Sequence, residues 1–276
     1  MRSLGRSRRQ ILLGSLPGAS RVAQSASLGR PPARLRKAAV LATALTLAMS
    51  SGLAAPRLVA AARGCDSNPD NFFAGYAGVE GSVKIEGASA SLTYRTADVC
   101  IGGFGSGQFF TGWTMIAGAQ WFQYAQSGFL FDGNPLGCTR HFAQQSNAVN
   151  TFTTKTGSCV SGGEVHHAWQ QYVPNTGGHV RSNIDSTIFL ESTFNELNWT
   201  HPWSAQYSGE VGNMQDDIPG LAASKTDWST VQIQYFTDNV YRTTCSHITL
   251  TREVDNARWS ADAPACDHLR AWTNTK

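Results

Sequence analysis

The sequence predicts an all-β protein, an antiparallel β-sandwich of the jelly-roll kind that is held by disulfides and preceded by an export signal. Three observations support this class: many short aromatic or β-branched segments between turn residues, little helical periodicity, and an even number of cysteines, six, behind a signal-like front. Many short strands with regular turns are typical of two packed antiparallel sheets. Since no repeat or linker divides the chain, we expect a single sandwich domain over residues 63–276.

The expected strands are short segments bounded by Gly, Asn, Asp or Pro. They are Tyr76–Ile85, Ala90–Tyr94, Phe109–Ala117, Trp121–Phe131, Cys138–Gln145, His167–Val173, His179–Asn183, Thr187–Thr193, Ala205–Val211, Thr230–Phe236 and His247–Arg252. Only Ile218–Ser224 and Asn256–Trp272 offer possible helical turns.

The stretch Gly112–Phe131 reads as two long strands joined by a turn around Gly118. Side chains alternate in the second strand, which places Gln126 on the same face as Tyr124. Burying an unpaired amide costs on the order of 1 to 3 kcal/mol, so protein, water or a ligand must satisfy Gln126. The sequence leaves two readings open: an ordinary cross-strand or solvated amide, and a binding or catalytic amide on a sheet face.

Residues 1–62 resemble an export signal rather than a folded segment. They contain ten Lys or Arg and no Asp or Glu, so the formal charge of +3 for the whole chain becomes about −7 for residues 63–276. The segment SRRQILLG at Ser7–Gly14 resembles a twin-arginine signal, and basic RLRK at Arg34–Lys37 precedes the apolar run Ala38–Ala55. We therefore expect cleavage between Ala55 and Arg63 and a secreted, extracellular protein.

The remaining composition excludes several classes of partner. The negative charge of residues 63–276 disfavours nucleic acid and anionic membrane surfaces. No other apolar run is long enough to predict a membrane span in the mature chain. The oligomeric state has no sequence signal.

The cysteines predict disulfides, because all six follow the export signal and no Cys/His spacing is typical of zinc. Pairing of sequence neighbours is the simplest arrangement, with each bridge closing a hairpin or end loop and contributing roughly 3 kcal/mol. The expected bridges are Cys65–Cys100, Cys138–Cys159 and Cys245–Cys266.

Few polar residues are candidates for chemistry. No GxSxG motif is present, and a turn or solvated edge explains Glu164 with His166 and His167 better than a metal site does. Asp216 and Asp217 before Pro219-Gly220 fit a turn without calcium. We expect neither a metal nor a cofactor.

Glu210 is the most informative acid. In the strand Ala205–Val211 it shares a face with Gln206 and Ser208, and few charges lie near it in sequence. Carboxylates in such surroundings tend toward a raised pKa, which suits a general acid or base.

Three short segments, WTMI at Trp113–Ile116, YAQSGF at Tyr124–Phe129 and AQYSGE at Ala205–Glu210, together resemble the glutamic peptidases of the eqolisin type and their neprosin-like relatives. In eqolisins a tryptophan strand precedes a strand with the catalytic glutamine, and a later strand ends in the catalytic glutamate. Gln126 and Glu210 occupy those positions. Neprosin-like proteins carry glutamate at the first position and Gly-Glu-Val at the second, which Gly209-Glu210-Val211 matches.

The resemblance implies an antiparallel β-sandwich that hydrolyses peptide bonds without a covalent intermediate. Glu210 would take a proton from water and return it to the leaving amine, while Gln126 would hold the water and donate to the oxyanion. Trp113, Tyr124 and Gln144 would contact the substrate.

The match has two departures and leaves alternatives open. The strand Cys138–Gln144 lacks the aromatic and acidic companions of eqolisins, so the substrate groove could differ or be absent. A second Gly-Glu-Val at Gly163–Val165 comes too early in the strand order, so Glu210 is preferred. The face with Trp113, Tyr124, Gln126 and Gln144 could instead bind sugar rings without catalysis, or the sandwich could be a structural surface module.

Overall fold

The structure is a computed structural model that describes residues 63–66, 70–79, 84–100, 108–120, 122–133, 137–148, 151–173, 179–193, 202–235, 240–246 and 248–274. The predicted leader at residues 1–62 lies outside these ranges, so the leader and the domain boundary at residue 63 stay predictions. Within the described ranges no helix has the length and hydropathy needed to cross a bilayer.

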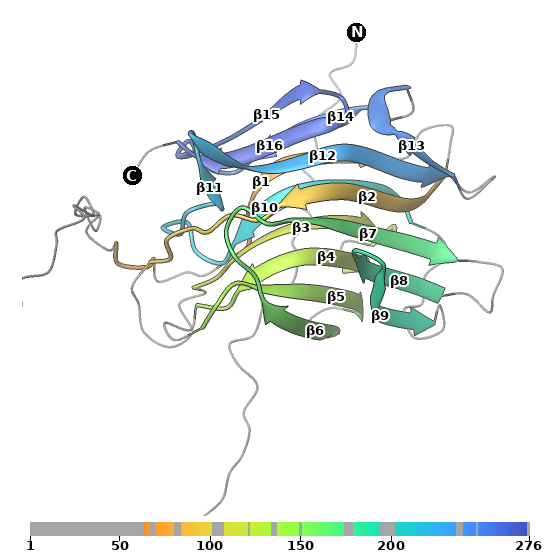
Figure 1. Cartoon of the computed structure of the whole chain (residues 1–276), viewed down its shortest axis with the longest axis horizontal. Coiled ribbons are helices and arrows are strands. Elements are labelled where there is room, and N and C mark those ends of the chain that lie inside the picture. Colours follow the sequence, from red (N-terminus) through yellow and green to blue (C-terminus); the bar gives the residue numbers. More distant parts are fainter. Residues whose placement is uncertain are drawn as a thin grey trace, which may run out of the picture. The chain divides into compact units, whose positions relative to one another are not determined.

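Two sheets of strands form the described part of the chain (Figure 1). The seven-stranded sheet has the order β14 (Leu250–Val254), β1 (Phe72–Val79), β10 (Ser204–Val211), β3 (Phe110–Ala117), β4 (Tyr124–Phe131), β5 (Arg140–Ala148) and β6 (Thr151–Cys159). The nine-stranded sheet has the order β15 (Trp259–Ala265), β16 (His268–Thr273), β11 (Gly220–Leu221), β12 (Ser224–Tyr235), β2 (Ile85–Thr93), β7 (Val165–Val173), β8 (His179–Ile184) and β9 (Thr187–Thr193), with β13 (Tyr241–Thr243) paired to β12.

The strand pairs are antiparallel except for the short parallel contact of β11 with β16. The predicted fold class, an antiparallel β-sandwich, is therefore confirmed. Among the described residues the only helical element is the 3-10 turn η1 (Thr244–Ser246).

The main core lies between the sheets, and the alternation along β4 and β10 explains how it is built. Ala125 and Phe129 of β4 and Ala205 and Tyr207 of β10 point into this core. Their neighbours in sequence, Gln126 among them, point to the opposite, outer face of the seven-stranded sheet. The predicted division of faces along both strands is confirmed.

A second, smaller apolar cluster lies on that outer face. It consists of Trp113, Met115, Ala117, Tyr124 and Phe142, all buried. The outer face is therefore buried and partly apolar where β3, β4 and β5 meet.

Some strand predictions were wrong. The expected strand Tyr76–Ile85 is two strands, because β1 ends at Val79 and β2 begins at Ile85. The possible helical turns at Asn256–Trp272 are the hairpin β15–β16, in which buried Trp259 and Ala261 alternate with less buried residues at the period of a strand. Ile218–Ser224 contains the short strand β11, and the edge strand β6 was missed.

All three disulfides join the predicted partners, Cys65 with Cys100, Cys138 with Cys159 and Cys245 with Cys266. Cys138 and Cys159 lie beside the ends of the paired strands β5 and β6, which explains why neighbours in sequence are also neighbours in space.

Candidate functional site

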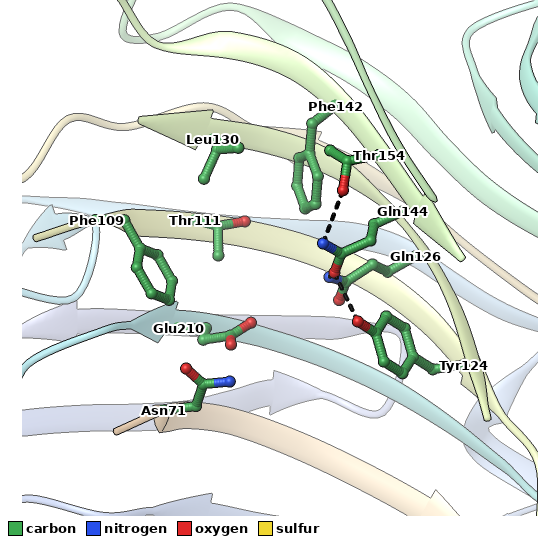
Figure 2. A pocket seen from close by; sticks show the side chains of 10 residues that line it. All are labelled: Asn71, Phe109, Thr111, Tyr124, Gln126, Leu130, Phe142, Gln144, Thr154 and Glu210. Atoms are coloured by element: carbon green, nitrogen blue, oxygen red, sulfur yellow. Dashed lines mark hydrogen bonds between the residues drawn. The ribbon is translucent and has the colours of Figure 1, made fainter. Parts of the chain in front are cut away.

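A pocket opens on the outer face of the seven-stranded sheet (Figure 2). Its cavity volume is about 50 Å³, which accommodates a few water molecules or one small side chain. The lining residues come from the start of β1 and from β3, β4, β5, β6 and β10: Asn71, Phe109, Thr111, Tyr124, Gln126, Leu130, Phe142, Gln144, Thr154 and Glu210. Four of the five residues predicted as catalytic or substrate-binding are in this set.

Glu210 lies at one end of the pocket, beside Asn71 in Figure 2. Its side chain is buried, with 4% of the residue exposed, and its Oε2 accepts a hydrogen bond of 2.8 Å from Nε1 of Trp113. Burial raises the pKa of Glu210 to about 7, although the hydrogen bond from Trp113 opposes this shift. A carboxyl with this pKa can take up and release a proton near neutral pH.

Trp113, the fifth predicted residue, is fully buried and does not line the pocket. It packs in the outer-face cluster and offers its indole N–H to Glu210. Its placement favours holding the carboxylate over contacting a substrate.

Gln126, Gln144 and Tyr124 form a hydrogen-bonded cluster at the other end of the pocket (Figure 2). Oε1 of Gln144 accepts from the Tyr124 hydroxyl at 2.8 Å and from Nε2 of Gln126 at 2.9 Å, and Nε2 of Gln144 donates to Thr154 Oγ1 at 2.9 Å. Burial raises the pKa of Tyr124, and the charge of Glu210 raises it further. The field of the Glu210 carboxylate therefore reaches the cluster.

Gln126 and Glu210 project from the same face but from different rows of the sheet. Gln126 pairs with Met115 of β3, which pairs with Gln206 of β10, and Glu210 lies four residues beyond Gln206. Their Cα atoms are thus separated by about 13 Å along the strands and about 10 Å across them. A ligand that contacts both side chains must span the pocket.

Glycine keeps this face of β4 open between Gln126 and Leu130. A Cβ on Gly128 would collide with the main-chain oxygen of Gly112 on β3. A side chain at position 128 would force the strands apart, so glycine is required for the close approach.

Sequence reasoning missed several lining residues. Thr154 lies on β6, a polar edge strand without the alternation that marks a half-buried strand. Asn71 precedes β1, where no sequence pattern indicates a site. Leu130 and Phe142 could have been predicted, because strand alternation places Leu130 on the same face as Gln126 and Phe142 on the same face as Gln144.

The other sequence candidates lie away from the pocket. His166 Nδ1 lies 2.9 Å from Asp185 Oδ2, and its Nε2 lies 3.2 Å from Glu164 Oε2, so both ring nitrogens are engaged. Asp217 Oδ1 accepts from both Arg63 and Arg258. These contacts explain Glu164, His166 and Asp217 as members of ion pairs.

Metal-ligating groups converge at only one place in the described ranges, at Cys245, Cys266 and Asp267. Both cysteines there form a disulfide, so neither offers the thiolate that binds a metal.

No protein-family model matches the chain, and no curated protein sequence is similar to it. Solved structures are similar in fold. A scytalido-glutamic peptidase bound to a peptide-based transition state analogue has a TM-score of 0.50 and 11% identity, with 75% of this chain and 100% of that chain covered. SCP-B, a member of the eqolisin family of peptidases in complex with the tripeptide Ala-Ile-His, has a TM-score of 0.50, 10% identity and the same coverage. This protein thus shares its fold, at a distant level, with the glutamic peptidases.

Proposed function

We propose that this protein is a secreted hydrolase of peptide bonds in which Glu210 is the general base and Gln126 stabilises the oxyanion. The observation that carries the proposal is the buried Glu210 carboxyl, with a pKa of about 7, at one end of a pocket whose other end is lined by Gln126. The distant fold similarity to glutamic peptidases supports it. Secretion is supported by the three disulfides and the signal-like front.

We place a substrate carbonyl between the two residues, because both line the same pocket but lie in different rows of the sheet. Glu210, a water, the carbonyl group and the amide N–H of Gln126, each at ordinary contact distances, form a chain of up to about 10 Å. Because the two residues occupy different rows of the sheet, such a chain fits better than one water held by both.

The proposal assigns a group to each step. Glu210 removes a proton from the water as its oxygen bonds to the carbonyl carbon, and the negative charge that develops on the carbonyl oxygen is met by the amide N–H of Gln126. The protonated Glu210 next gives its proton to the leaving amine as the C–N bond breaks. Both water protons and the bonding electrons are accounted for, and the carboxylate is regenerated.

The test is casein cleavage by the purified mature protein. We expect the wild type to cleave casein and Glu210→Gln to lose at least 10²-fold in rate, since the amide cannot accept the proton. Glu164→Gln is the matched control, because it makes the same change in the second Gly-Glu-Val, away from the pocket, and should leave the rate unchanged. A Glu210→Gln protein with full rate across acidic and neutral pH would refute the assignment.

A second candidate, carbohydrate binding without catalysis, is favoured by the rings that line the pocket. Phe109, Tyr124 and Phe142 line it together with the amides of Gln126 and Gln144, and aromatic rings beside amides are the residue types that sugar-binding sites use. A glycan array distinguishes the candidates. Retention of a glycan without casein cleavage would favour the lectin-like reading.

A further inference from the structure

Side chains are hydrogen-bonded to both ends of the Gln144 amide. Its Oε1 accepts from Tyr124 and Gln126, and its Nε2 donates to Thr154, each at 2.8 or 2.9 Å. The residue is 5% exposed. A side chain with this many protein partners is held in place rather than left available for substrate.

The contacts of Gln144 determine what Gln126 offers to a ligand. A primary amide has two N–H donors and one carbonyl acceptor. Gln126 gives one N–H to Gln144, and among the described residues its buried Oε1 has no hydrogen-bond partner. The second N–H of Gln126 therefore remains for a molecule in the pocket.

The two amides must turn together. If the amide of Gln144 were reversed, its Nε2 would face Nε2 of Gln126, and two donors would oppose each other unless Gln126 also reversed. The hydroxyls of Tyr124 and Thr154 can each donate or accept, so they fit either arrangement and hold Gln144 in place in both. The direction of the Gln126 amide is thus set by which end of Gln144 faces it.

We propose that Gln144 is a positioning residue for the hydrolysis proposed above: its Oε1 holds one N–H of Gln126 and so directs the other N–H at the substrate carbonyl. Thr154 acts one step further out, because it accepts from the opposite end of the Gln144 amide. This inference rests on the proposed function for its kinetic part, whereas the orientation of Gln126 is independent of any activity.

The kinetic test uses Gln144→Met, which keeps the length and lack of branching of the side chain but removes the strong acceptor. We expect kcat to fall by about 10- to 100-fold with KM changed less than threefold, because a transition-state contact is misdirected while ground-state binding persists. Thr154→Val should lower kcat by several-fold, and Thr154→Ser, which keeps the hydroxyl, should restore it. A wild-type kcat in Gln144→Met would overturn the proposal. So would a Thr154→Ser protein whose kcat falls as much as that of Thr154→Val.

A second measurement separates this proposal from the proposed function. The side-chain NH₂ group of Gln126 should show one slowly exchanging proton by ¹⁵N NMR in the wild type, and this protection should be lost in Gln144→Met. The NH₂ group of Gln206, which contacts Ser204 and not Gln144, is the internal control and should be unchanged. If the wild type cleaves nothing, the hydrogen exchange of the Gln126 NH₂ group still tests how Gln144 orients Gln126. Equal exchange at Gln126 in the wild type and in Gln144→Met would refute that orientation.

Discussion

Glu210 at the end of β10 and Asp216 in the loop that follows are both buried carboxyls whose pKa burial raises to about 7, yet their surroundings differ. Glu210 accepts one side-chain hydrogen bond, from Trp113, and lines the pocket. Asp216 accepts from the main-chain N–H of Cys100 at 2.7 Å and does not line the pocket. One carboxyl faces a space that a substrate can enter, and the other ties loops together.

The difference shows that a raised pKa alone does not identify a catalytic group. Burial acts on both carboxyls in the same direction, because it penalises the charged form wherever it occurs. Access to a cavity and a neighbouring donor cluster are what separate Glu210 from Asp216. Structural groups with perturbed pKa values are expected beside functional ones.

The sharpest test of the comparison neutralises each carboxyl in turn. Glu210→Gln should lower casein cleavage by at least 10²-fold, whereas Asp216→Asn should change it by less than threefold, because the asparagine oxygen can still accept from Cys100. The measurement is kcat/KM for both variants, with melting temperatures to verify folding. Equal losses in the two variants would remove the distinction between them.

The free energy of unfolding should fall as pH rises, because folding raises the pKa values of both Glu210 and Asp216. The pKa of Glu210 rises from 4.5 to about 7 and that of Asp216 from 3.8 to about 7, so between these limits the folded protein keeps protons that the unfolded chain releases. The stability from each group is full below its unfolded pKa and is lost as pH rises through 7, by about 3 kcal/mol for Glu210. Urea denaturation between pH 4 and 8 measures this decline.

The same neutralising substitutions provide the control. In the double variant Glu210→Gln, Asp216→Asn neither group titrates, so the curve of unfolding free energy against pH should be flatter than that of the wild type. A double variant with the slope of the wild type would show that other groups cause the decline.

Substitution of Trp113 tests how its hydrogen bond affects the pKa of Glu210. Its hydrogen bond lowers the pKa of Glu210, so Trp113→Phe should raise that pKa and move the acidic limb of the rate profile to higher pH. Trp228→Phe is the matched control, because Trp228 is also fully buried but donates to the main-chain oxygen of Trp113. An equal shift in both variants would point to a general packing effect.

The sequence predicted those parts of the molecule in which local pattern and tertiary environment agree. Alternation along Tyr124–Phe131 and Ala205–Val211 gave the two faces of these strands, because each strand has one side in the core. The disulfides followed from proximity in the chain. Gln126 and Glu210 were recognised from motifs on those strands, and the structure brings both to one pocket.

The rest depends on contacts that no local pattern carries. Thr154 reaches the pocket from an edge strand whose polar residues do not alternate with apolar ones. The four-residue offset of Glu210 from the row of Gln126 is set by the register of β3 against both of its neighbours. Strand register between distant segments is a tertiary property, so the sequence could place both residues on one face without placing them in one row.

The smallest effect is expected at the second Gly-Glu-Val. Glu164 has the same flanking residues as Glu210, but it is exposed, and the hydrogen bond from His166 lowers its pKa. The two glutamates should therefore titrate on opposite sides of the usual range, Glu210 near 7 and Glu164 below it, in a ¹³C NMR titration of the side-chain carboxyls. Glu164→Gln should leave both casein cleavage and the melting temperature within experimental error. Among the hydrogen bonds of the described residues, none joins Glu164 to a residue of the pocket. A loss of activity in Glu164→Gln would therefore contradict the assignment of the general base to Glu210.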